Sequence, residues 1–355
     1  MTNTLPPATA TSPGMPMPRI AILILNWNGK QDTLECLASV YRIDYSAFDV
    51  VVVDNGSADD SVQAIRHSYP QAVILETGAN LGFAGGNNVG IRWALEQGFD
   101  GILLLNNDTV VDPGLLAAFA GAERRFPGAG VFGAKIYYYS PEDVLWFAGG
   151  LWQSKSLSFT HVGIGKLDGP EYAEPRAYDY ITGCALYASA EVFRAIGLLD
   201  EAFFLTYEET DWCYRARARG YQCLYIPEAK LWHKVSVSCG GAASPLVNYF
   251  MTRNKLLWAK KHLPMKARWQ LHRQTWRKLR RILLPPFILM EEDVSLQRRI
   301  LWAVASWRKD LAENLANRMH RTTLLAVRDH YLGRYGDCPA AVRVLVKRPN
   351  IESSP

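Results

Sequence analysis

Three apolar runs in the first third of the chain each end in Asn and Asp residues, and this repeated pattern constrains the fold more than any other feature. The runs cover residues 22–29, 51–57 and 102–109. An unbroken series of Val, Ile and Leu is typical of a strand buried on both faces, and helical stretches follow the runs, so the pattern predicts an α/β fold with a parallel sheet. Ligands of such sheets bind beyond the carboxyl ends of the strands. The polar side chains expected there are Asn26, Asn28, Asp54, Asn55, Asn106, Asn107 and Asp108.

The pattern of apolar runs changes after about residue 130. From residue 130 to residue 187, short aromatic and β-branched segments alternate with Gly, Ser and Pro, which predicts a mixed, partly antiparallel sheet. We expect helices near residues 190–196 and 209–219, and a strand at residues 222–227. The rest of the chain has a helical, amphipathic pattern.

Charge is divided unevenly along the chain. The net charge is +5, but residues 241–355 contain 22 Lys and Arg against 8 Asp and Glu, while the remainder contains 17 against 26. A basic tail could bind nucleic acid or an anionic membrane. Its five tryptophans favour the membrane interface, where Trp is enriched, and argue against nucleic acid. They are Trp258, Trp269, Trp276, Trp302 and Trp307.

One segment of the tail carries this prediction. Within residues 266–284, Trp269, Trp276, Leu279 and Leu283 recur largely at helical spacing among seven Lys and Arg residues. The segment predicts a basic amphipathic helix that lies on anionic lipid. In the alternative, the tryptophans pack onto the preceding α/β domain and the basic side is solvated.

Targeting signals are weak in this sequence. Residues 1–18 have neither the charged start nor the apolar core of a signal peptide, so we expect a disordered lead. An apolar, uncharged segment of the tail, residues 282–290, contains two prolines and is too short to span a bilayer. Six cysteines without CxxC spacing predict a reducing compartment. We expect a cytoplasmic protein, peripheral on the cytoplasmic face of the inner membrane.

The glycine-rich segment at residues 80–88, NLGFAGGNN, follows a short strand expected at residues 73–76. It has no GxGxxG pattern, so a dinucleotide-binding site is poorly supported. The segment predicts a turn whose backbone passes close to a nucleotide or a sugar, and the flanking Asn80, Asn87 and Asn88 favour this interpretation. The alternative is a tight connection between a strand and a helix.

Two further clusters suggest chemistry. A divalent cation that bridges phosphates often needs only one or two carboxylates plus water, and Asp108 supplies one carboxylate. His233 could add an imidazole, which suits Mn²⁺ as well as Mg²⁺, although in isolation a structural histidine is the more common case. At residues 208–211, the carboxylates of Glu208, Glu209 and Asp211 could simply favour a helix N-terminus. They could also provide a general base for an attacking hydroxyl, with Glu209 as the candidate and Asp211 orienting it or contacting the acceptor.

An ordered series of motifs resembles a known family. NWNG, DNGS, NLGFAGGNN, LLNNDT, TGCALYA, GLLDEAFFLTYEETDWCYRARARGY and WHKVSVS are similar to the inverting glycosyltransferases of family 2. Within that family, they resemble the rhamnosyltransferase-like enzymes that build bacterial surface polysaccharides. The resemblance covers residues 19–241. It implies a GT-A catalytic domain there, between a lead at residues 1–18 and a basic helical extension at residues 242–355. It also implies a dTDP- or UDP-linked sugar donor, a glycan or polyprenyl-linked acceptor, and Mn²⁺ or Mg²⁺.

The resemblance also assigns roles to single positions. It places the metal on Asp108 and His233, the catalytic acidic pair on Glu208 and Glu209, and the contact with the base on Asp54. Two positions depart from the family pattern, because Asn106 replaces the first carboxylate of the metal motif and Glu209 replaces the usual Asp, so Asp211 stays open as the base. The implied nucleotide-sugar contacts are Asn26, Asn28, Asp54, Asn55, Asn80, Gly82, Phe83, Gly86, Asn87, Asn107 and Asp108.

Two other functions compete with glycosyl transfer. A nucleotidyltransferase can also use a metal and an α/β nucleotide fold, but it is expected to carry a glycine-rich and basic triphosphate loop near the first strand. This chain has NWNGKQDT there, with a single Lys30. A non-catalytic binding protein derived from a transferase is the second rival, and the presence of Asp108, Glu209 and His233 together argues against it.

Overall fold

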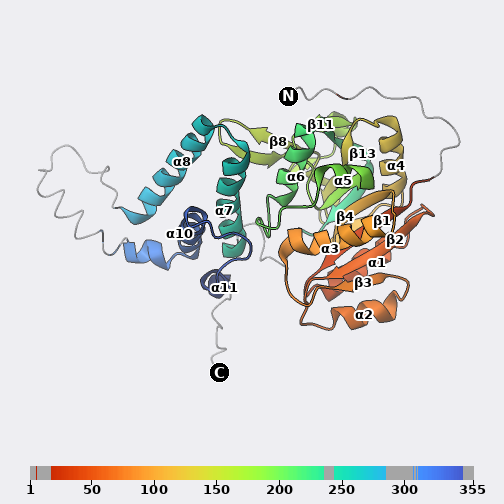
Figure 1. Ribbon diagram of the computed structural model, residues 1–355, viewed down its shortest axis with the longest axis horizontal. Helices are drawn as coiled ribbons and strands as arrows, with labels where there is room; N and C mark the ends of the chain where they lie inside the picture. The colour runs from red at the N-terminus through yellow and green to blue at the C-terminus, as the bar shows by residue number, and fades with distance from the viewer. Residues whose placement is uncertain are drawn as a thin grey trace, which may run out of the picture. The chain divides into compact units, whose positions relative to one another are not determined.

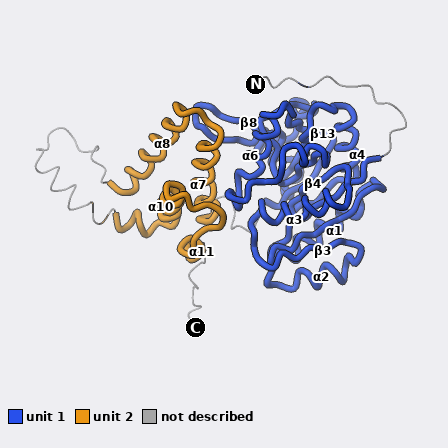
Figure 2. Tube along the Cα trace, viewed as in Figure 1, with its two compact units in different colours: residues 1–238 blue, residues 239–355 orange. Residues whose placement is uncertain are grey.

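The computed structural model describes Leu5, residues 17–235, residues 244–284, Trp307, Lys309 and residues 311–346. A large β-sheet with helices around it precedes a helical region (Figure 1). The chain divides into two compact units, residues 1–238 and residues 239–355 (Figure 2). No helix in the described part of the chain is both long enough and apolar enough to cross a membrane.

The centre of the sheet is the parallel α/β arrangement that the three apolar runs predicted. Strand β1 (Ile20–Asn26) lies between β2 (Phe48–Asp54) and β4 (Gly101–Asn106), parallel to both, and β3 (Val73–Glu76) lies beside β2. The first five side chains of β1 are fully buried, because neighbouring strands and helices cover it on every side. In the register of these strands, Asn26 is paired with Asp54, and Leu25 is paired with Asn106. The three polar strand ends therefore meet at one edge of the sheet.

The second half of the sheet is mixed, as predicted for residues 130–187. Strand β12 (Ala185–Ser189) lies antiparallel between β4 and β6 (Gly130–Tyr138). Strand β13 (Gln222–His233) runs parallel to β6 and antiparallel to the short strand β5 (Thr109–Val111), so it is longer than the expected strand at residues 222–227. The remaining strands are β7 (Val144–Phe147), β8 (Gly150–Gln153), β9 (Ser158–His161), β10 (Lys166–Leu167) and β11 (Arg176–Tyr178).

Helix α3 (Gly82–Glu96) corrects the expectation of a turn over residues 80–88, because the helix begins at Gly82. It packs against β1, β2 and β4. A Cβ atom on Gly90 would lie 3.0 Å from side-chain atoms of Leu23 and Val53, and one on Gly86 would overlap Leu25. Glycine at these positions lets the helix approach the sheet closely, despite its low helix propensity. The other helices of this unit are α1 (Lys30–Val40), α2 (Ser61–Ser68), α4 (Leu115–Arg125), α5 (Ala190–Ile196) and α6 (Glu208–Ala218).

The second unit is helical in its described part, as the pattern of the tail predicted. Ser244 caps α7 (Pro245–His262) by accepting a hydrogen bond from the Val247 backbone N–H at 3.1 Å, and the proline fits the first turn. Polar side chains join α7 to α10, since the Tyr249 hydroxyl donates to Asp329 Oδ2 at 2.8 Å. The other helices are α8 (Met265–Leu283), α10 (Arg318–Tyr331) and α11 (Ala340–Val346).

Candidate active site

A relay of hydrogen bonds links the three polar strand ends. The Asn26 side-chain amide donates to Asp54 Oδ1 at 2.8 Å, and its Oδ1 accepts from the Thr33 hydroxyl at 2.8 Å. Thr33 in turn accepts from the Asn107 amide at 2.9 Å. Asn26 and Thr33 are fully buried, so Asn26 supports this edge from within the fold. Thr33, in the interior of α1, had not been singled out from the sequence.

The loops above this edge are tied to one another. The other oxygen of Asp54 accepts from the Ser57 backbone N–H at 3.0 Å, which forms a turn typical of Asp. Asn28 adopts a left-handed conformation, and its Oδ1 accepts from the Ala58 N–H at 2.7 Å. Asn55 donates to Asn80 Oδ1 at 3.2 Å and accepts from the Leu81 N–H at 2.9 Å.

Asp108 and His233 lie in direct contact. Antiparallel pairing of β5 with β13 aligns Thr109 with His233, and this register brings the two side chains together. Asp108 Oδ1 lies 3.1 Å from His233 Nε2, and both residues are 4 % exposed. Asn107, next to Asp108, is partly exposed.

This pair fits a divalent cation. A buried carboxylate beside an imidazole is a donor set that Mn²⁺ and Mg²⁺ accept, and the second ring nitrogen of His233 is buried without a hydrogen-bond partner. In the described part of the chain, no group of three or more His, Cys, Asp and Glu residues could hold a metal. Water and phosphate oxygens would therefore complete the coordination, as is usual when a cation bridges a nucleotide diphosphate.

Glu208 and Glu209 begin helix α6, where Glu208 is buried and Glu209 is partly exposed. Each has one carboxylate oxygen that is buried and has no hydrogen-bond partner. Burial, followed by the negative charge of Glu209, holds the pKa of Glu208 well above its usual range. Burial raises the pKa of Glu209 to about 7, although backbone hydrogen bonds at Glu209 and Thr210 act to lower it. Near neutral pH, Glu209 is thus the carboxylate of the pair that more readily gives up its proton.

The loop that leads into α6 is strained. Phe204, Thr206 and Tyr207 all have positive φ values, between 64° and 74°, a region that bulky residues rarely adopt. Such strain persists only when the surrounding structure holds it, and it concentrates at functional sites. Here the Phe204 carbonyl accepts the Phe83 backbone N–H at 2.6 Å, which fastens the loop to the start of α3. A Cβ atom on Gly82 would overlap Phe204, so only glycine allows this contact.

Gly183 and Cys184 join the two ends of the site. A Cβ atom on Gly183 would lie 2.9 Å from the Phe83 ring and 3.7 Å from the Glu209 Cβ. The next residue, Cys184, accepts the Asn106 backbone N–H at 3.0 Å. This short segment places the acidic pair of α6 and the end of β4 beside each other, in one site.

Asp211 is engaged elsewhere. Its Oδ2 accepts from Arg215 Nε at 2.8 Å, and it is fully buried. The same guanidinium donates to the carbonyls of Ile196 and Leu198 at 2.9 and 2.8 Å. Asp211 therefore anchors the loop before α6 through Arg215, an arrangement that suits a structural carboxylate better than a proton acceptor.

Two aromatic residues of this region had not been singled out from the sequence. The Trp146 ring meets the His233 ring edge-on, with centroids 4.5 Å apart, and meets the His161 ring in the same way at 4.7 Å. Burial lowers the pKa of His161 to about 4, so this side chain is neutral at pH 7. The Nδ1 atom of His161 is buried without a hydrogen-bond partner. These ring contacts join segments that are distant in the chain, so no local motif marks them.

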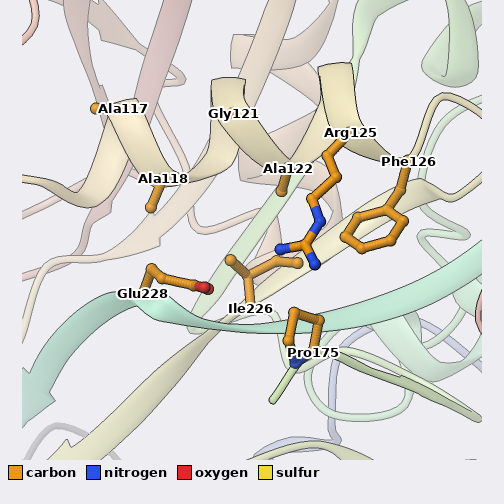
Figure 3. Close-up of a pocket in the computed structure, with 9 residues that line it drawn as sticks. All are labelled: Ala117, Ala118, Gly121, Ala122, Arg125, Phe126, Pro175, Ile226 and Glu228. Carbon is orange, nitrogen blue, oxygen red and sulfur yellow. The ribbon is translucent and has the colours of Figure 1, made fainter. Parts of the chain in front are cut away.

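A separate cavity lies away from these residues. Its volume is about 290 Å³, and it lies between α4 and β13 (Figure 3). Arg125, Phe126, Ile226 and Glu228 are among its lining residues. None of the predicted site residues contributes to it.

Solved structures identify the fold. A mannosyltransferase from Pyrobaculum calidifontis, in complex with GDP-Man and Mn²⁺, matches with a TM-score of 0.54 and 15 % identity over 93 % of this chain and 91 % of that one. GalNAc-T7 with UDP, GalNAc and Mn²⁺ matches with a TM-score of 0.58 and 13 % identity over 85 % of this chain and 56 % of that one. The fold is therefore that of the GT-A glycosyltransferases, as predicted.

The family follows from sequence. Residues 21–187, a little under half of the chain, match the model of Glycosyl transferase family 2, so this region is similar to that family. The resemblance of its ordered motifs is thereby confirmed, and a nucleotidyltransferase is not supported.

Curated relatives are consistent with a rhamnosyltransferase-like member. An N-acetylglucosaminyl-diphospho-decaprenol L-rhamnosyltransferase from Mycobacterium tuberculosis is 28 % identical over 58 % of this chain and 72 % of its own length. A dTDP-rhamnosyl transferase from Shigella flexneri is 27 % identical over 61 % and 72 %. The low-salt glycan biosynthesis hexosyltransferase Agl10 from Haloferax volcanii is 27 % identical over 56 % of this chain and 61 % of the relative, less than two thirds of its length.

Proposed function

We propose that this protein is an inverting, metal-dependent glycosyltransferase that transfers a sugar from a nucleotide-diphosphate donor to a hydroxyl of a glycan or polyprenyl-linked acceptor. Rhamnose from dTDP-rhamnose is the donor to test first, because two relatives are named rhamnosyltransferases and one of them is named for the dTDP-linked sugar. Catalysis would reside in residues 19–241, and residues 242–355 would contact a membrane. The enzyme would then work at the cytoplasmic face of the inner membrane.

The observation that carries this proposal is the Glu208–Glu209 pair, in which each residue has a buried, unpartnered carboxylate oxygen, close to the polar ends of the strands. Glu209 takes the proton of the acceptor hydroxyl while the hydroxyl oxygen attacks the anomeric carbon of the donor. The bond from that carbon to the diphosphate oxygen breaks, and the nucleoside diphosphate leaves. A base with a pKa near the working pH is the most effective proton acceptor, and the Glu209 pKa of about 7 meets this condition. One displacement with one base inverts the anomeric centre.

Asp108 and His233 are the residues that would hold Mn²⁺ or Mg²⁺. A cation bound there neutralises the charge of the leaving diphosphate. With one carboxylate and an Asn at position 106, the protein supplies little negative charge of its own. We infer that the metal binds more tightly with the nucleotide present than alone.

The nucleoside and donor sugar would lie over the strand edge. Asp54, Asn55 and Asn28 would contact the nucleoside, while Asn80, Gly82 and Phe83 would line the donor from the loop before α3 and its first turn. Gly86 and Asn87 lie deeper. Gly86 faces Leu25 and Asn55, and the Asn87 amide donates to the Phe83 carbonyl at 2.9 Å. Both would shape the pocket indirectly, as would Asn26.

Glu209→Gln is the decisive variant. Nucleotide release from dTDP-rhamnose, UDP-sugars and GDP-sugars is measured with Mn²⁺ or Mg²⁺ and an acceptor extract, and nucleotide binding is measured by calorimetry. We expect Glu209→Gln to bind nucleotide normally and to lose about 10²–10⁴-fold in transfer, the range that general bases contribute. Glu191→Gln, an exposed carboxylate on α5, is the matched control. Near-normal turnover in Glu209→Gln would place the base elsewhere and reject this mechanism.

A further inference from the structure

Helix α8 has two different faces. Leu271, Leu279 and Ile282 are buried, and the helix packs against α7. In contrast, Trp269 is 62 % exposed and Trp276 is 57 % exposed. The sequence had suggested a single apolar stripe that included both tryptophans and Leu279, but the structure separates them. The aliphatic face anchors the helix, and the indole rings lie on the surface.

Basic side chains share the surface of the two tryptophans. The Arg273 guanidinium lies over the Trp269 ring, 5.0 Å from its centroid. At 100° per residue, Met265, Trp269, Arg273, Trp276 and Arg280 fall within an arc of about 80° on the helix. All five are exposed, and α8 contains neither Asp nor Glu. An aromatic and cationic strip therefore runs along one side of α8.

The strip continues onto α10. The Trp276 and Tyr331 rings have centroids 6.2 Å apart, and the Tyr331 hydroxyl lies 2.7 Å from His272 Nδ1 of α8. Tyr331 is 49 % exposed. We define the aromatic–basic face as Met265, Trp269, Arg273, Trp276, Arg280 and Tyr331.

We propose that the aromatic–basic face binds the anionic surface of a lipid bilayer. Trp and Tyr place amphipathic rings at the level of the lipid headgroups, and arginines are attracted to anionic lipid. An exposed Met beside two exposed Trp residues gives the face apolar side chains that can enter the headgroup boundary, as in helices that lie in the membrane plane. This proposal deepens the proposed function, because a polyprenyl-linked acceptor would lie in such a bilayer.

Vesicle flotation of the full-length protein tests this surface. The vesicles contain either phosphatidylcholine alone or phosphatidylcholine with about 30 % phosphatidylglycerol. We expect at least tenfold more protein to float with the anionic vesicles. The double variant Trp269→Ala/Trp276→Ala and the double variant Arg273→Gln/Arg280→Gln should each lower that binding about tenfold. Val344→Ala removes another exposed apolar side chain of the same unit, 67 % exposed, and should leave binding unchanged.

Several outcomes would overturn the proposal. Equal binding to both vesicle types removes the electrostatic part, and unchanged binding in the Trp double variant places the contact elsewhere. Binding of single-stranded RNA that exceeds vesicle binding and is lost in the same variants would assign the face to nucleic acid, since bases also stack on aromatic residues beside Arg. Nucleotide release across the whole donor panel (dTDP-rhamnose, UDP-sugars and GDP-sugars), measured without vesicles, separates this inference from the proposed function. Release without vesicle binding rejects only the membrane face, and vesicle binding without release rejects only the transferase assignment.

Discussion

The two ends of the candidate site differ in how their polar side chains are satisfied. At the end proposed to bind the nucleoside, Asn26 hydrogen bonds to both Asp54 and Thr33 at the strand edge. At the end proposed to be catalytic, Glu208 and Glu209 each hold a buried oxygen without a hydrogen-bond partner. Buried polar groups stabilise a fold when they are paired and cost free energy when they are not. The paired side chains of the first end therefore stabilise the fold. The unpaired carboxylates of the second end cost folding free energy, and the same burial raises the pKa of Glu209 to a value that suits proton transfer.

The largest expected effect that would test this difference between the two ends is a loss of activity at low pH. Glu209 must be ionised to accept a proton, and burial raises its pKa to about 7. We therefore expect kcat/KM to fall about tenfold per pH unit below pH 7, or about 100-fold by pH 5, as the base becomes protonated. Initial rates measured across pH 5–9 check this.

Glu208→Gln is the matched variant for the pH profile. Burial holds the pKa of Glu208 well above its usual range, so Glu208 stays protonated while Glu209 titrates. Replacing this neutral side chain by neutral Gln should therefore leave the midpoint of the acid limb in place. A midpoint near 4.5 would mean that the base is solvated and lies elsewhere. A midpoint well above 7 that disappears in Glu208→Gln would make Glu208 the base.

The next effect concerns stability, where the two ends should respond with opposite sign. Asn26→Ala leaves Asp54 and the Thr33 hydroxyl without their buried partner, so the free energy of unfolding should fall by about 2 kcal/mol. Asn107→Ala removes one hydrogen bond to the same Thr33 from a partly exposed residue and should cost about 1 kcal/mol or less. Urea unfolding measures both variants. Equal losses would show that the relay does not depend on the buried Asn26.

Glu209→Gln should instead stabilise the protein, and only at higher pH. The pKa of Glu209 is higher in the folded protein than in the unfolded chain, so the folded state binds the extra proton, and stability falls as the pH rises from about 4.5 to 7. Replacement by neutral Gln removes this dependence. The gain should be on the order of 3 kcal/mol at pH 8 and close to zero at pH 4. A constant gain at both pH values would contradict the assignment of a buried charge.

The sequence predicted the frame of this site better than its supports. Alternation of apolar runs with Asx residues identified the parallel strands and their polar edge, because both signals are local in the chain. Thr33, Trp146 and His161 could not be found in this way, since their roles arise from contacts between distant segments. The glycine-rich segment predicts a turn because glycine clusters after a strand are typical of turns and loops. In the structure, close packing of α3 on β1 and β2 overrides that tendency.

The smallest expected effect is on metal affinity, and it concerns the contact of Trp146 with His233, one of the two residues proposed to hold the metal. The edge-on contact between the Trp146 and His233 rings restricts the orientation of the imidazole that would hold the cation. Contacts of this kind contribute about 1 kcal/mol, which corresponds to roughly fivefold in affinity. Trp146→Ala should therefore weaken Mn²⁺ binding about fivefold, measured from the electron paramagnetic resonance signal of free Mn²⁺.

Trp152→Ala is the matched control for this measurement, because Trp152 packs on Phe159, at a centroid distance of 4.9 Å, in the neighbouring hairpin. It should leave Mn²⁺ binding unchanged. Asp108→Asn, which removes the carboxylate itself, should abolish binding in the same assay and so sets the scale. Trp146→Phe retains an aromatic edge and should recover most of the affinity that alanine loses. If Trp146→Ala binds Mn²⁺ like the unaltered protein, the orientation of His233 depends on Asp108 alone, and the aromatic side chains serve only to pack the strands.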